Sequence, residues 1–402
     1  MSDSAETGTV VRVEQSIGAV DKAAWDACAN PPTRAYNPFV AHGFLEALEA
    51  SGAVAPDTGW LPQHLVLESK DGTVAGCMPC YLKSHSQGEY VFDHGWAAAF
   101  EAAGGDYYPK IQCGVPFTPV TGRRLLVADD DERSSHETLL AYAAVQLTRK
   151  LGASSLHITF PTEAEWTHLG ELGMLRRIDQ QFHWENKGYN TFDDFLAELS
   201  SRKRKTFKKE RREALGNGIE IEWLTGAEIT EAHWDVFFQF YLDTGERKWG
   251  TPYLNREFFS LVSQSMGKDV LLMMCRFEGR HIAGALHLIG GDTLYGRYWG
   301  CLEDHPFLHF ETCYYQAIDF AIAHGLKYVE AGAQGSHKLA RGYLPVTTYS
   351  AHFIVNQGLS AAVEDYLEQE RAAVNREADF LRALSPFKST LRNPPLDVDL
   401  QT

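Results

Sequence analysis

Polar side chains suited to acid–base and anion chemistry follow a predicted strand that ends at Glu330. The stretch AGAQGSHKLARGYLP, residues 331–345, holds two early glycines that let the backbone approach a ligand closely. Turns after strand ends in open α/β sheets commonly hold ligands. The polar side chains of this turn are Gln334, His337, Lys338 and Arg341. We therefore predict a ligand site here, the alternative being a structural loop with solvated charges.

These residue types suit the formation of an amide. Such a reaction needs a group that accepts the proton of the attacking amine, and positive charge that stabilises the oxyanion. We predict Glu330 or His337 as the proton acceptor. Lys338 and Arg341 would bind a donor phosphate or the oxyanion, and Gln334 would bind substrate through its amide.

Further candidate pocket residues lie upstream of this turn. Arg297 and Tyr298 belong to the predicted strand TLYGRYWGC, and Glu311 belongs to the predicted helix LHFETCYYQAIDF. An apolar stripe on that helix is more typical of core than of a cofactor site. The stripe is Phe310, Tyr314 and Ile318. Glu311 lies one residue beyond the first of these, so it can face elsewhere.

The first half of the chain offers three more candidate substrate-binding residues. Asp93 and His94 are adjacent in EYVFDHGWA, and Lys110 follows in DYYPKI. Neighbours on a strand point to opposite faces, so this Asp–His pair is weak evidence of a catalytic dyad. A site and simple turn chemistry both remain open for Asp93 and His94.

A strongly basic stretch, SSRKRKTFKKERREAL, occupies residues 200–215. It holds eight Lys and Arg against two Glu, in a chain whose net charge is −16. Like charges at this spacing destabilise a helix, so the presence of the basic cluster favours a functional role for it. The predicted phosphate-binding residues are Arg202, Lys203, Lys205, Lys208, Lys209 and Arg212. They could bind a tRNA, a coenzyme or lipid head groups. The alternative is a solvated face, and we expect Phe207 to anchor the helix to the core.

Several common functional motifs are absent. The sequence contains no GxGxxG, GxxxxGK[ST], GxSxG or HExxH pattern, so a Rossmann cofactor, a P-loop, a serine nucleophile elbow and this zinc site are not expected. The one CxxC, Cys77 with Cys80, has no partner motif and reads as two buried small residues. We expect no metal and no permanently bound cofactor. The residues that are present suit a reaction in which two bound substrates react with each other directly.

The remaining sequence features indicate a protein of the cytoplasm. No stretch of about 18 apolar residues occurs, and no secretory signal is evident at the N-terminus. The seven scattered cysteines fit a reducing compartment. The acidic net charge argues against a surface coated for nucleic acid, although it leaves room for one basic face.

The order of predicted elements positions these residues in two similar domains. Two helices, an antiparallel meander, a helix and a strand occur once in each half. We expect an α/β (α+β) fold of two tandem domains with mixed, mostly antiparallel sheets flanked by helices, plus a C-terminal helix. The expected ranges are 1–187, 188–357 with the basic helix at 200–215, and 358–402.

Long segments of the chain resemble the Fem-like group of GNAT-related N-acyltransferases, relatives of the Fem peptidoglycan aminoacyltransferases. They are FETCYYQAIDFAIAHGLKYVEAGAQGSHKLARGYLPVTTYSAHF, KSHSQGEYVFDHGWA and YYPKIQCGVPFTPVTGRRLL. The resemblance implies tandem GNAT-like domains and an activated acyl or aminoacyl donor attacked by an amine. In Fem proteins that donor is aminoacyl-tRNA and the acceptor is a peptidoglycan precursor.

Three functional hypotheses follow. The first is a Fem-like acyl- or aminoacyltransferase that acts on an amine acceptor of the cell envelope, with tRNA or an anionic membrane as a partner of the basic stretch. The second is an N-acyltransferase that uses acyl-CoA or an acyl carrier. The glycine-rich CoA turn of GNAT enzymes is missing, however, since the link before the helix reads LEDHPFLH. The third is a non-catalytic binding protein.

Overall fold

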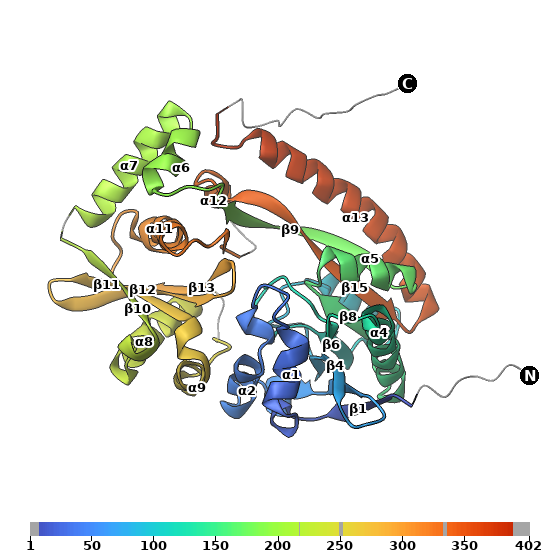
Figure 1. The fold of residues 1–402 in the computed structure, drawn as a ribbon. Helices are drawn as coiled ribbons and strands as arrows, with labels where there is room; N and C mark the ends of the chain where they lie inside the picture. Colours follow the sequence, from blue (N-terminus) through green and yellow to red (C-terminus); the bar gives the residue numbers. More distant parts are fainter. Residues whose placement is uncertain (1–7, 217, 249–251, 333–335, 389–402) are drawn as a thin grey trace, which may run out of the picture. The chain divides into compact units, whose positions relative to one another are not determined.

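The computed structural model describes residues 8–216, 218–248, 252–332 and 336–388 (Figure 1). It divides into two compact units, each assembled from three segments of the chain. The first unit contains residues 1–179, 253–267 and 348–372. The second unit contains residues 180–252, 268–347 and 373–402. The expected domain ranges differ from this grouping and stay a prediction.

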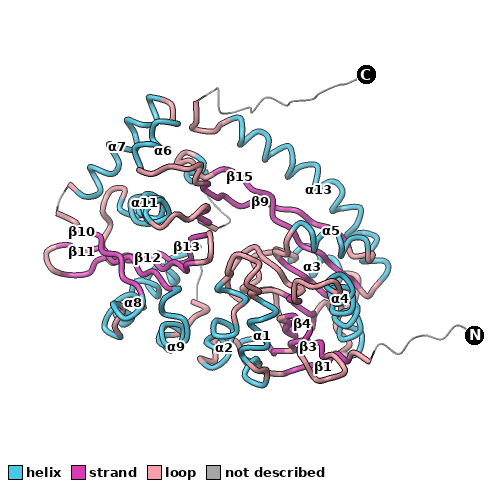
Figure 2. The backbone as a smooth tube through the Cα atoms, viewed as in Figure 1, coloured by secondary structure: helices cyan, strands magenta, loops and turns pink. Residues whose placement is uncertain are grey.

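The strands of the first unit form two sheets (Figure 2). They are β1 (Val10–Glu14), β2 (Trp60–Pro62), β3 (His64–Glu68), β4 (Val74–Met78), β5 (Cys80–Lys83), β6 (Lys110–Cys113), β7 (Leu126–Val127), β8 (Ser155–Thr159), the first half of β9 (Leu175–Glu185) and the second half of β15 (Leu344–Ile354). One sheet is antiparallel with the order β1-β3-β4-β7. In the other, β15, β8, β6, β5 and β2 are neighbours in that order, and β6 pairs with β8 in parallel.

Helices cover these sheets because apolar residues alternate along the strands. The helices are α1 (Lys22–Ala29), α2 (His42–Ala50), α3 (His94–Ala102), α4 (Arg133–Lys150), α5 (Glu163–Glu171) and α9 (Arg256–Met266). Ile111 on β6 and Leu156 on β8 pack with Leu140 and Ala144 of α4 in one apolar core. Full burial of such a side chain contributes about 1.5–3 kcal/mol.

The second unit contains a mixed sheet. Its strands are the second half of β9, β10 (Glu220–Thr225), β11 (Val270–Phe277), β12 (Arg280–Ile289), β13 (Thr293–Cys301), β14 (Tyr328–Glu330) and the first part of β15. The order is β10-β11-β12-β13-β14-β9, in which β13 and β14 are parallel and the other neighbours antiparallel. The expected meander of three strands, β11 to β13, is confirmed.

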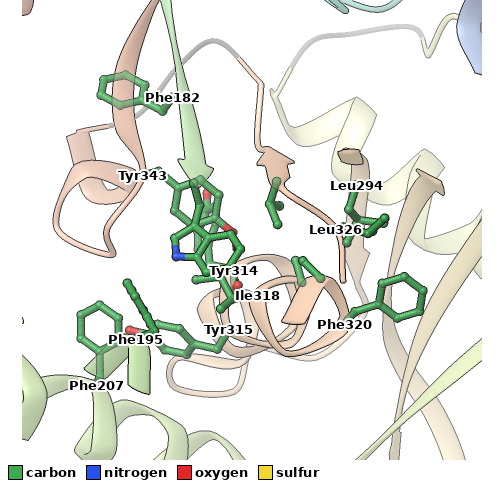
Figure 3. Close-up of a cluster of buried hydrophobic side chains, with 14 of the residues drawn as sticks. Phe182, Phe195, Phe207, Leu294, Tyr314, Tyr315, Ile318, Phe320, Leu326 and Tyr343 are labelled. Atoms are coloured by element: carbon green, nitrogen blue, oxygen red, sulfur yellow. Dashed lines mark hydrogen bonds between the residues drawn. The ribbon is translucent and has the colours of Figure 1, made fainter. Parts of the chain in front are cut away.

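Helices of the second unit lie on both faces of this sheet. They are α6 (Phe192–Glu198), α7 (Ser201–Leu215), α8 (Glu231–Lys248), α10 (Leu308–Phe310), a π-helical turn η6 (Glu311–Tyr315), α11 (Gln316–Ala323) and α12 (Ser336–Leu339). Figure 1 shows α11 and α8 on opposite faces. The aromatic core under α11 includes Tyr314, Tyr315 and Phe207 of α7 (Figure 3), so the expected anchoring role of Phe207 is confirmed.

The remaining elements are short turns and the C-terminal helix. The 3-10 turns are η1 (Ile17–Ala19), η2 (Pro38–Val40), η3 (Pro56–Thr58), η4 (Gly226–Glu228) and η5 (Gly267–Asp269). The expected C-terminal helix is α13 (Gln357–Ala383). The predicted α/β fold with mixed, mostly antiparallel sheets is confirmed. None of the helices in the described residues is both long and apolar enough to span a membrane.

Two local expectations are corrected by the structure, and the start of the basic helix is defined. The basic helix α7 is separate from α6, because the chain is extended at Leu199 and Ser200 between them. The helix after the meander is interrupted by the π-helical turn η6. Asp93 and His94 lie at the start of helix α3 rather than on a strand, with Asp93 as its first flanking residue.

Candidate functional site

The parallel strands β13 and β14 separate at the point where the predicted site begins. Their pairing ends at Tyr295 and Glu330, where β14 ends while β13 continues. Arg297, two residues beyond, is the extra residue of a β-bulge between β12 and β13. Bulges re-aim a side chain and are frequent beside active sites. The separation of the strands and the bulge together bring Arg297 to Glu330.

Arg297 and Glu330 form a buried charged group, with the ring of His183 beside it. Arg297 Nη2 donates to Glu330 Oε2 at 3.0 Å, and His183 Nε2 of β9 lies 3.3 Å from Oε1. The Glu330 side chain is 2 % exposed and that of Arg297 5 %. Burial alone would raise the pKa of Glu330, but Arg297 and His183 outweigh it, so this pKa is lowered. Glu330 is therefore held as a carboxylate.

Lys338 lies on the short helix α12 beside this group. Its Nζ donates to the carbonyl oxygen of Gly332 at 3.0 Å. Burial lowers the pKa of Lys338 to about 8, with the charge of Arg297 acting in the same direction. Close to neutral pH the lysine thus exists in both protonation states. Gln334, the predicted amide ligand, lies outside the described residues.

His337 is bonded to the π-helical turn. Its Nε2 lies 3.0 Å from the hydroxyl of Tyr314, which is in η6. The ring also packs beside Phe310 and His309. Single π-helical turns are frequent at functional sites. The predicted core role of Tyr314 is therefore incomplete, because its ring is in the core while its hydroxyl contacts a candidate catalytic histidine.

Arg341 is a buried, ion-paired side chain. Its Nη2 donates to Glu210 Oε2 at 2.8 Å, and Nη1 donates to the carbonyl oxygen of His337 at 2.9 Å. The guanidinium centre lies 3.3 Å from the centre of the Phe310 ring. These contacts occupy Arg341 within the protein and favour a role in holding His337.

Two other predicted pocket residues have partners outside this charged group. Tyr298 packs edge-on against Tyr241 of α8, with ring centres 5.0 Å apart. Glu311 accepts hydrogen bonds from Arg211 and Gln316. Burial raises the pKa of Glu311, and Arg211 opposes that shift. The substrate-binding role expected of both residues stays a prediction.

The basic helix α7 has one buried and one charged face. Phe207, Glu210 and Ala214 are buried. The exposed basic residues are Arg202, Lys205, Lys208, Lys209 and Arg212, whereas Lys203 is partly buried. Lys208 lies 3.1 Å from Asp193 and Lys209 lies 3.7 Å from Glu213. Such exposed pairs are worth about 0–1 kcal/mol each and yield readily to a polyanion.

The first unit holds a second buried polar cluster, on one face of its larger sheet. Tyr81, Gln112, His157 and His352 are directly opposite one another across β5, β6, β8 and β15. All four are buried. Their neighbours in sequence face the apolar core, so the strands alternate as expected but the polar face is covered rather than solvated. Buried polar faces are costly unless they are hydrogen-bonded.

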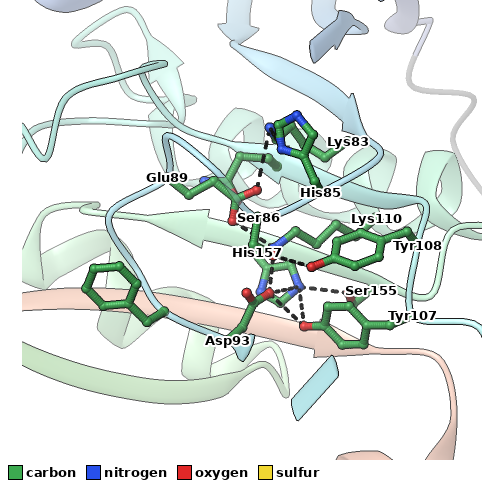
Figure 4. Close-up of polar contacts among 12 residues, drawn as sticks. Lys83, His85, Ser86, Glu89, Asp93, Tyr107, Tyr108, Lys110, Ser155 and His157 are labelled. Atoms are coloured by element: carbon green, nitrogen blue, oxygen red, sulfur yellow. Dashed lines mark hydrogen bonds and ion pairs between the residues drawn. The ribbon is translucent and has the colours of Figure 1, made fainter. Parts of the chain in front are cut away.

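Lys110 is the centre of this cluster (Figure 4). Its Nζ donates to Ser86 Oγ and Glu89 Oε2, each at 2.7 Å, and also to Asp93 Oδ2. The hydroxyl of Tyr107 donates to the same Asp93 oxygen at 2.8 Å. Burial would lower the pKa of Lys110, but Glu89 and Asp93 outweigh it and raise this pKa. The structure thus joins two of the three residues predicted in this half.

The third predicted residue, His94, does not join this cluster. It begins α3 with an exposed side chain that lies beside Phe92, whereas Asp93 turns inward. The buried Lys83 was missed. Its Nζ lies 3.5 Å from the centre of the Trp60 ring and 3.9 Å from Glu89 Oε1.

Burial shifts the pKa values of both Lys83 and Glu89. The pKa of Lys83 is lowered to about 7, and the pKa of Glu89 is raised to about 7. Among the described residues, the carboxylate oxygen Asp93 Oδ1 and the amide oxygen Gln112 Oε1 are buried without a hydrogen-bond donor. The same part of the chain holds no group of three or more His, Cys, Asp and Glu side chains arranged for a metal ion.

Solved structures with a similar fold cover most of the chain. FemX aligns over 86 % of this chain and 98 % of its own, with 14 % identity and a TM-score of 0.55. The C-terminal domain of a protein assigned as a lysylphosphatidylglycerol synthetase, from Agrobacterium fabrum, aligns over 88 % and 97 %, with 10 % identity and a TM-score of 0.54.

A third structure, a Bacteroides thetaiotaomicron protein of unknown function, aligns over 86 % and 100 %, with 9 % identity and a TM-score of 0.51. At these identities the likeness concerns the fold. No curated protein matches the sequence. The profile of the FemAB-like family, described as peptidoglycan biosynthesis and recognition, matches residues 16–389. This match spans nearly the whole chain, and the protein therefore belongs to the FemAB-like family.

Proposed function

We propose that this protein is an N-acyltransferase that transfers an acyl or aminoacyl group directly from an activated donor to an amine, with aminoacyl-tRNA as the donor. The supporting observation is the buried charged group of Arg297 and Glu330, with Lys338 beside it, where two parallel strands separate. The description of the family supports an acceptor among cell-envelope precursors. We place the reaction in the cytoplasm.

In the proposed reaction, His337 accepts the proton of the attacking amine. Both oxygens of Glu330 contact basic groups and its pKa is lowered, so Glu330 is a weak base that serves as a fixed counter-charge. The amine nitrogen bonds to the ester carbonyl carbon, and the developing oxyanion is held by the Lys338 ammonium. The ester C–O bond then breaks, and the ribose oxygen leaves with the proton from His337. An ammonium has three N–H donors, one of which Gly332 accepts.

The charged face of α7 supports tRNA as the donor. Its exposed lysines and arginines form a stripe along one side of the helix, with partners that are few and exposed. A phosphate backbone that contacts such a stripe releases counterions, so binding weakens steeply with salt. The same stripe would also attract an anionic membrane. In that case the protein would bind anionic vesicles and would not bind tRNA in the experiments below.

A specific feature argues against coenzyme A as the donor. The link between β13 and α10, where a GNAT enzyme would hold the pyrophosphate, carries Glu303 and Asp304. Glu303 is paired with Arg280 at 3.0 Å and lies 3.3 Å from His305. Two carboxylates in this short link oppose the binding of a pyrophosphate.

We propose that the polar face of the first unit binds a polar ligand of its own. Asp93 Oδ1 and Gln112 Oε1 are buried acceptors without a donor, so they suit a ligand that supplies N–H or O–H groups. Lys110 and Glu89 add opposite charges within hydrogen-bond distance of each other. An amine-bearing, hydroxyl-rich ligand would satisfy these groups.

Binding of labelled aminoacyl-tRNA at several salt concentrations tests the proposal. The variant Lys205→Gln/Lys208→Gln/Lys209→Gln removes three charges from α7, and Lys22→Gln/Lys150→Gln/Lys268→Gln removes three exposed charges elsewhere. The slope of log K against log salt should fall by about 2–3 in the α7 variant, at roughly 0.7–0.9 per contact. The control variant should keep the slope of the native protein.

Other outcomes separate the alternatives. If no tRNA binds at low salt, the tRNA donor is wrong. Saturable binding of acyl-CoA in the same assay would then favour a thioester donor. Binding to vesicles of phosphatidylglycerol that depends on the α7 lysines, without tRNA binding, would assign the helix to the membrane surface.

A further inference from the structure

The two faces of α7 link phosphate binding to the candidate catalytic histidine. We infer that Glu210 and Arg211, on the inner face of this helix, are positioning residues that hold His337 and the turn η6 in place. This inference rests on the proposed function, because it assigns the outer face of the same helix to the donor. It adds a positioning role for the inner face of α7 that the basic residues by themselves do not predict.

Glu210 is a buried carboxylate in an otherwise basic run. It accepts hydrogen bonds from the hydroxyl of Tyr315 and from Arg341 Nη2, the latter at 2.8 Å. Tyr315 is fully buried, and Arg341 is 6 % exposed. Hydrogen bonds to a charged group are the stronger ones, and a buried pair is strongly destabilised when one partner is lost. Glu210 therefore fixes two elements at once.

Both elements lead from Glu210 to His337. Along the first, Arg341 uses its other terminal nitrogen, Nη1, to donate to the carbonyl oxygen of His337 at 2.9 Å. Along the second, Tyr315 directly follows Tyr314 in η6, and the Tyr314 hydroxyl lies 3.0 Å from His337 Nε2. The backbone and the ring of His337 are thus each held by a route that starts at one carboxylate.

Arg211 holds the other end of the same turn. Its guanidinium donates to both oxygens of Glu311, the first residue of η6, at 2.9 and 3.1 Å. It also pairs with Asp319 of α11 and stacks over Phe192, 4.4 Å from the ring centre. Two consecutive residues of α7 therefore clamp η6 at its first and last residues. Such bidentate geometry restricts orientation more than a single charge contact does.

The opposite face of α7 carries the groups assigned to the donor. Lys205, Lys208, Lys209 and Arg212 are exposed, whereas Phe207 and Glu210 face the core. A donor bound on the outer face is therefore bound to the same rigid helix that sets the position of His337. Misplacement of a catalytic group by about 1 Å can cost about 100-fold in rate.

The exchange of backbone amide hydrogens tests the positioning role without any substrate. The amides of Arg341, Gly342 and Tyr343 bond to carbonyls of α12 at 2.9–3.2 Å and report on this segment. Glu210→Gln should accelerate their exchange by about 10-fold or more. Glu213→Gln is the matched control, because it changes an exposed glutamate on the same helix.

A second variant covers the case in which Glu210→Gln fails to fold. Tyr315→Phe keeps the buried ring and removes one hydrogen bond to Glu210. It should accelerate exchange in the same segment by a smaller factor. Equal exchange in Glu210→Gln, Tyr315→Phe and Glu213→Gln would overturn the inference.

Measurements with tRNA separate this inference from the proposed function. Uncharged tRNA should bind Glu210→Gln within about twofold of the native affinity, while kcat for transfer falls about 10- to 100-fold at an unchanged donor KM. If the native protein binds no tRNA, the proposed donor fails, and the exchange comparison still decides the positioning role. A parallel loss of tRNA affinity and kcat in Glu210→Gln would show general damage to α7 and contradict the inference.

Discussion

Arg297 and Glu330 meet on adjacent parallel strands, with Nη2 and Oε2 3.0 Å apart, just where those strands stop pairing. A polar pair at the diverging ends of parallel strands is positioned by the sheet itself. In the first unit, Lys110 and His157 also lie on a parallel pair, β6 and β8, but Lys110 precedes the first paired residue and His157 is opposite Gln112 within the pairing. The buried charge therefore lies at the start of the parallel pairing in the first unit and at its end in the second unit.

Removal of the charge on Glu330 should destabilise the protein. Glu330→Gln leaves Arg297 buried without its counter-charge, and such a loss costs about 3–5 kcal/mol in the free energy of unfolding. Urea denaturation measures the change. Glu303→Gln, which breaks an exposed pair with Arg280, should leave the free energy of unfolding unchanged.

The same carboxylate has a defined pH dependence. Its folded pKa is lowered, so it stabilises the fold above its unfolded pKa of about 4.3 and loses this contribution as pH falls. Native protein should lose stability on acidification more steeply than Glu330→Gln. Parallel curves for the two proteins would refute the assignment of Glu330 as a buried carboxylate.

Lys338 should react with an amine-directed reagent at lower pH than an ordinary lysine. Its pKa is lowered to about 8, so the neutral amine is populated about two pH units earlier than that of an exposed lysine. Mass spectrometry after brief labelling across pH 6–10 would measure this midpoint, with the exposed Lys268 as the internal control. Identical midpoints would contradict the shift.

The protonated form of Lys338 carries the proposed oxyanion contact. Transfer should therefore slow as pH rises through about 8. In Lys338→Met the rate should be about 100-fold lower and this alkaline decline should vanish. A Lys338→Met variant with the native rate and an unchanged melting temperature would remove the lysine from the mechanism.

Lys83 should make the stability of the protein rise with pH above neutrality. Its pKa is lowered by burial to about 7, whereas an unfolded lysine keeps its proton to about 10.4. The unfolded chain therefore binds more protons between these values, and stability increases with pH across that interval. Glu89, Asp93 and Lys110 share its surroundings, so the comparison is with Lys83→Met, which should lack this rise. Thermal melting at pH 7 and pH 9.5 measures it.

Some of this arrangement could be predicted from local sequence and some could not. The cluster after Glu330 was visible because polar residues and glycines follow a strand, and Lys110 was visible as a charge within an aromatic segment. The bulge that turns Arg297 depends on pairing with another strand, so the sequence of β13 alone does not contain it.

The missed partners come from distant segments. His183 belongs to β9, and Glu210 was counted within a basic run although its partner Arg341 is 131 residues away. Lys83 was missed because a lysine at a strand end is normally solvated. Alternation did offer a signal, since Lys83 is in phase with Tyr81 on the polar face. Helix α9, residues 256–266, belongs to the first unit because it packs against α2. The order of elements along the chain does not predict this contact.

The Tyr314 hydroxyl should matter for catalysis more than for folding. Tyr314→Phe keeps the ring in the core and removes the contact with His337 Nε2 at 3.0 Å, so the free energy of unfolding should change by about 1 kcal/mol. The transfer rate should fall about 10-fold or more, because His337 loses the group that orients its ring. Tyr142→Phe, at an exposed tyrosine, is the matched control. If both variants retained the native rate, His337 would act without help from η6, and the turn would be a feature of core packing alone.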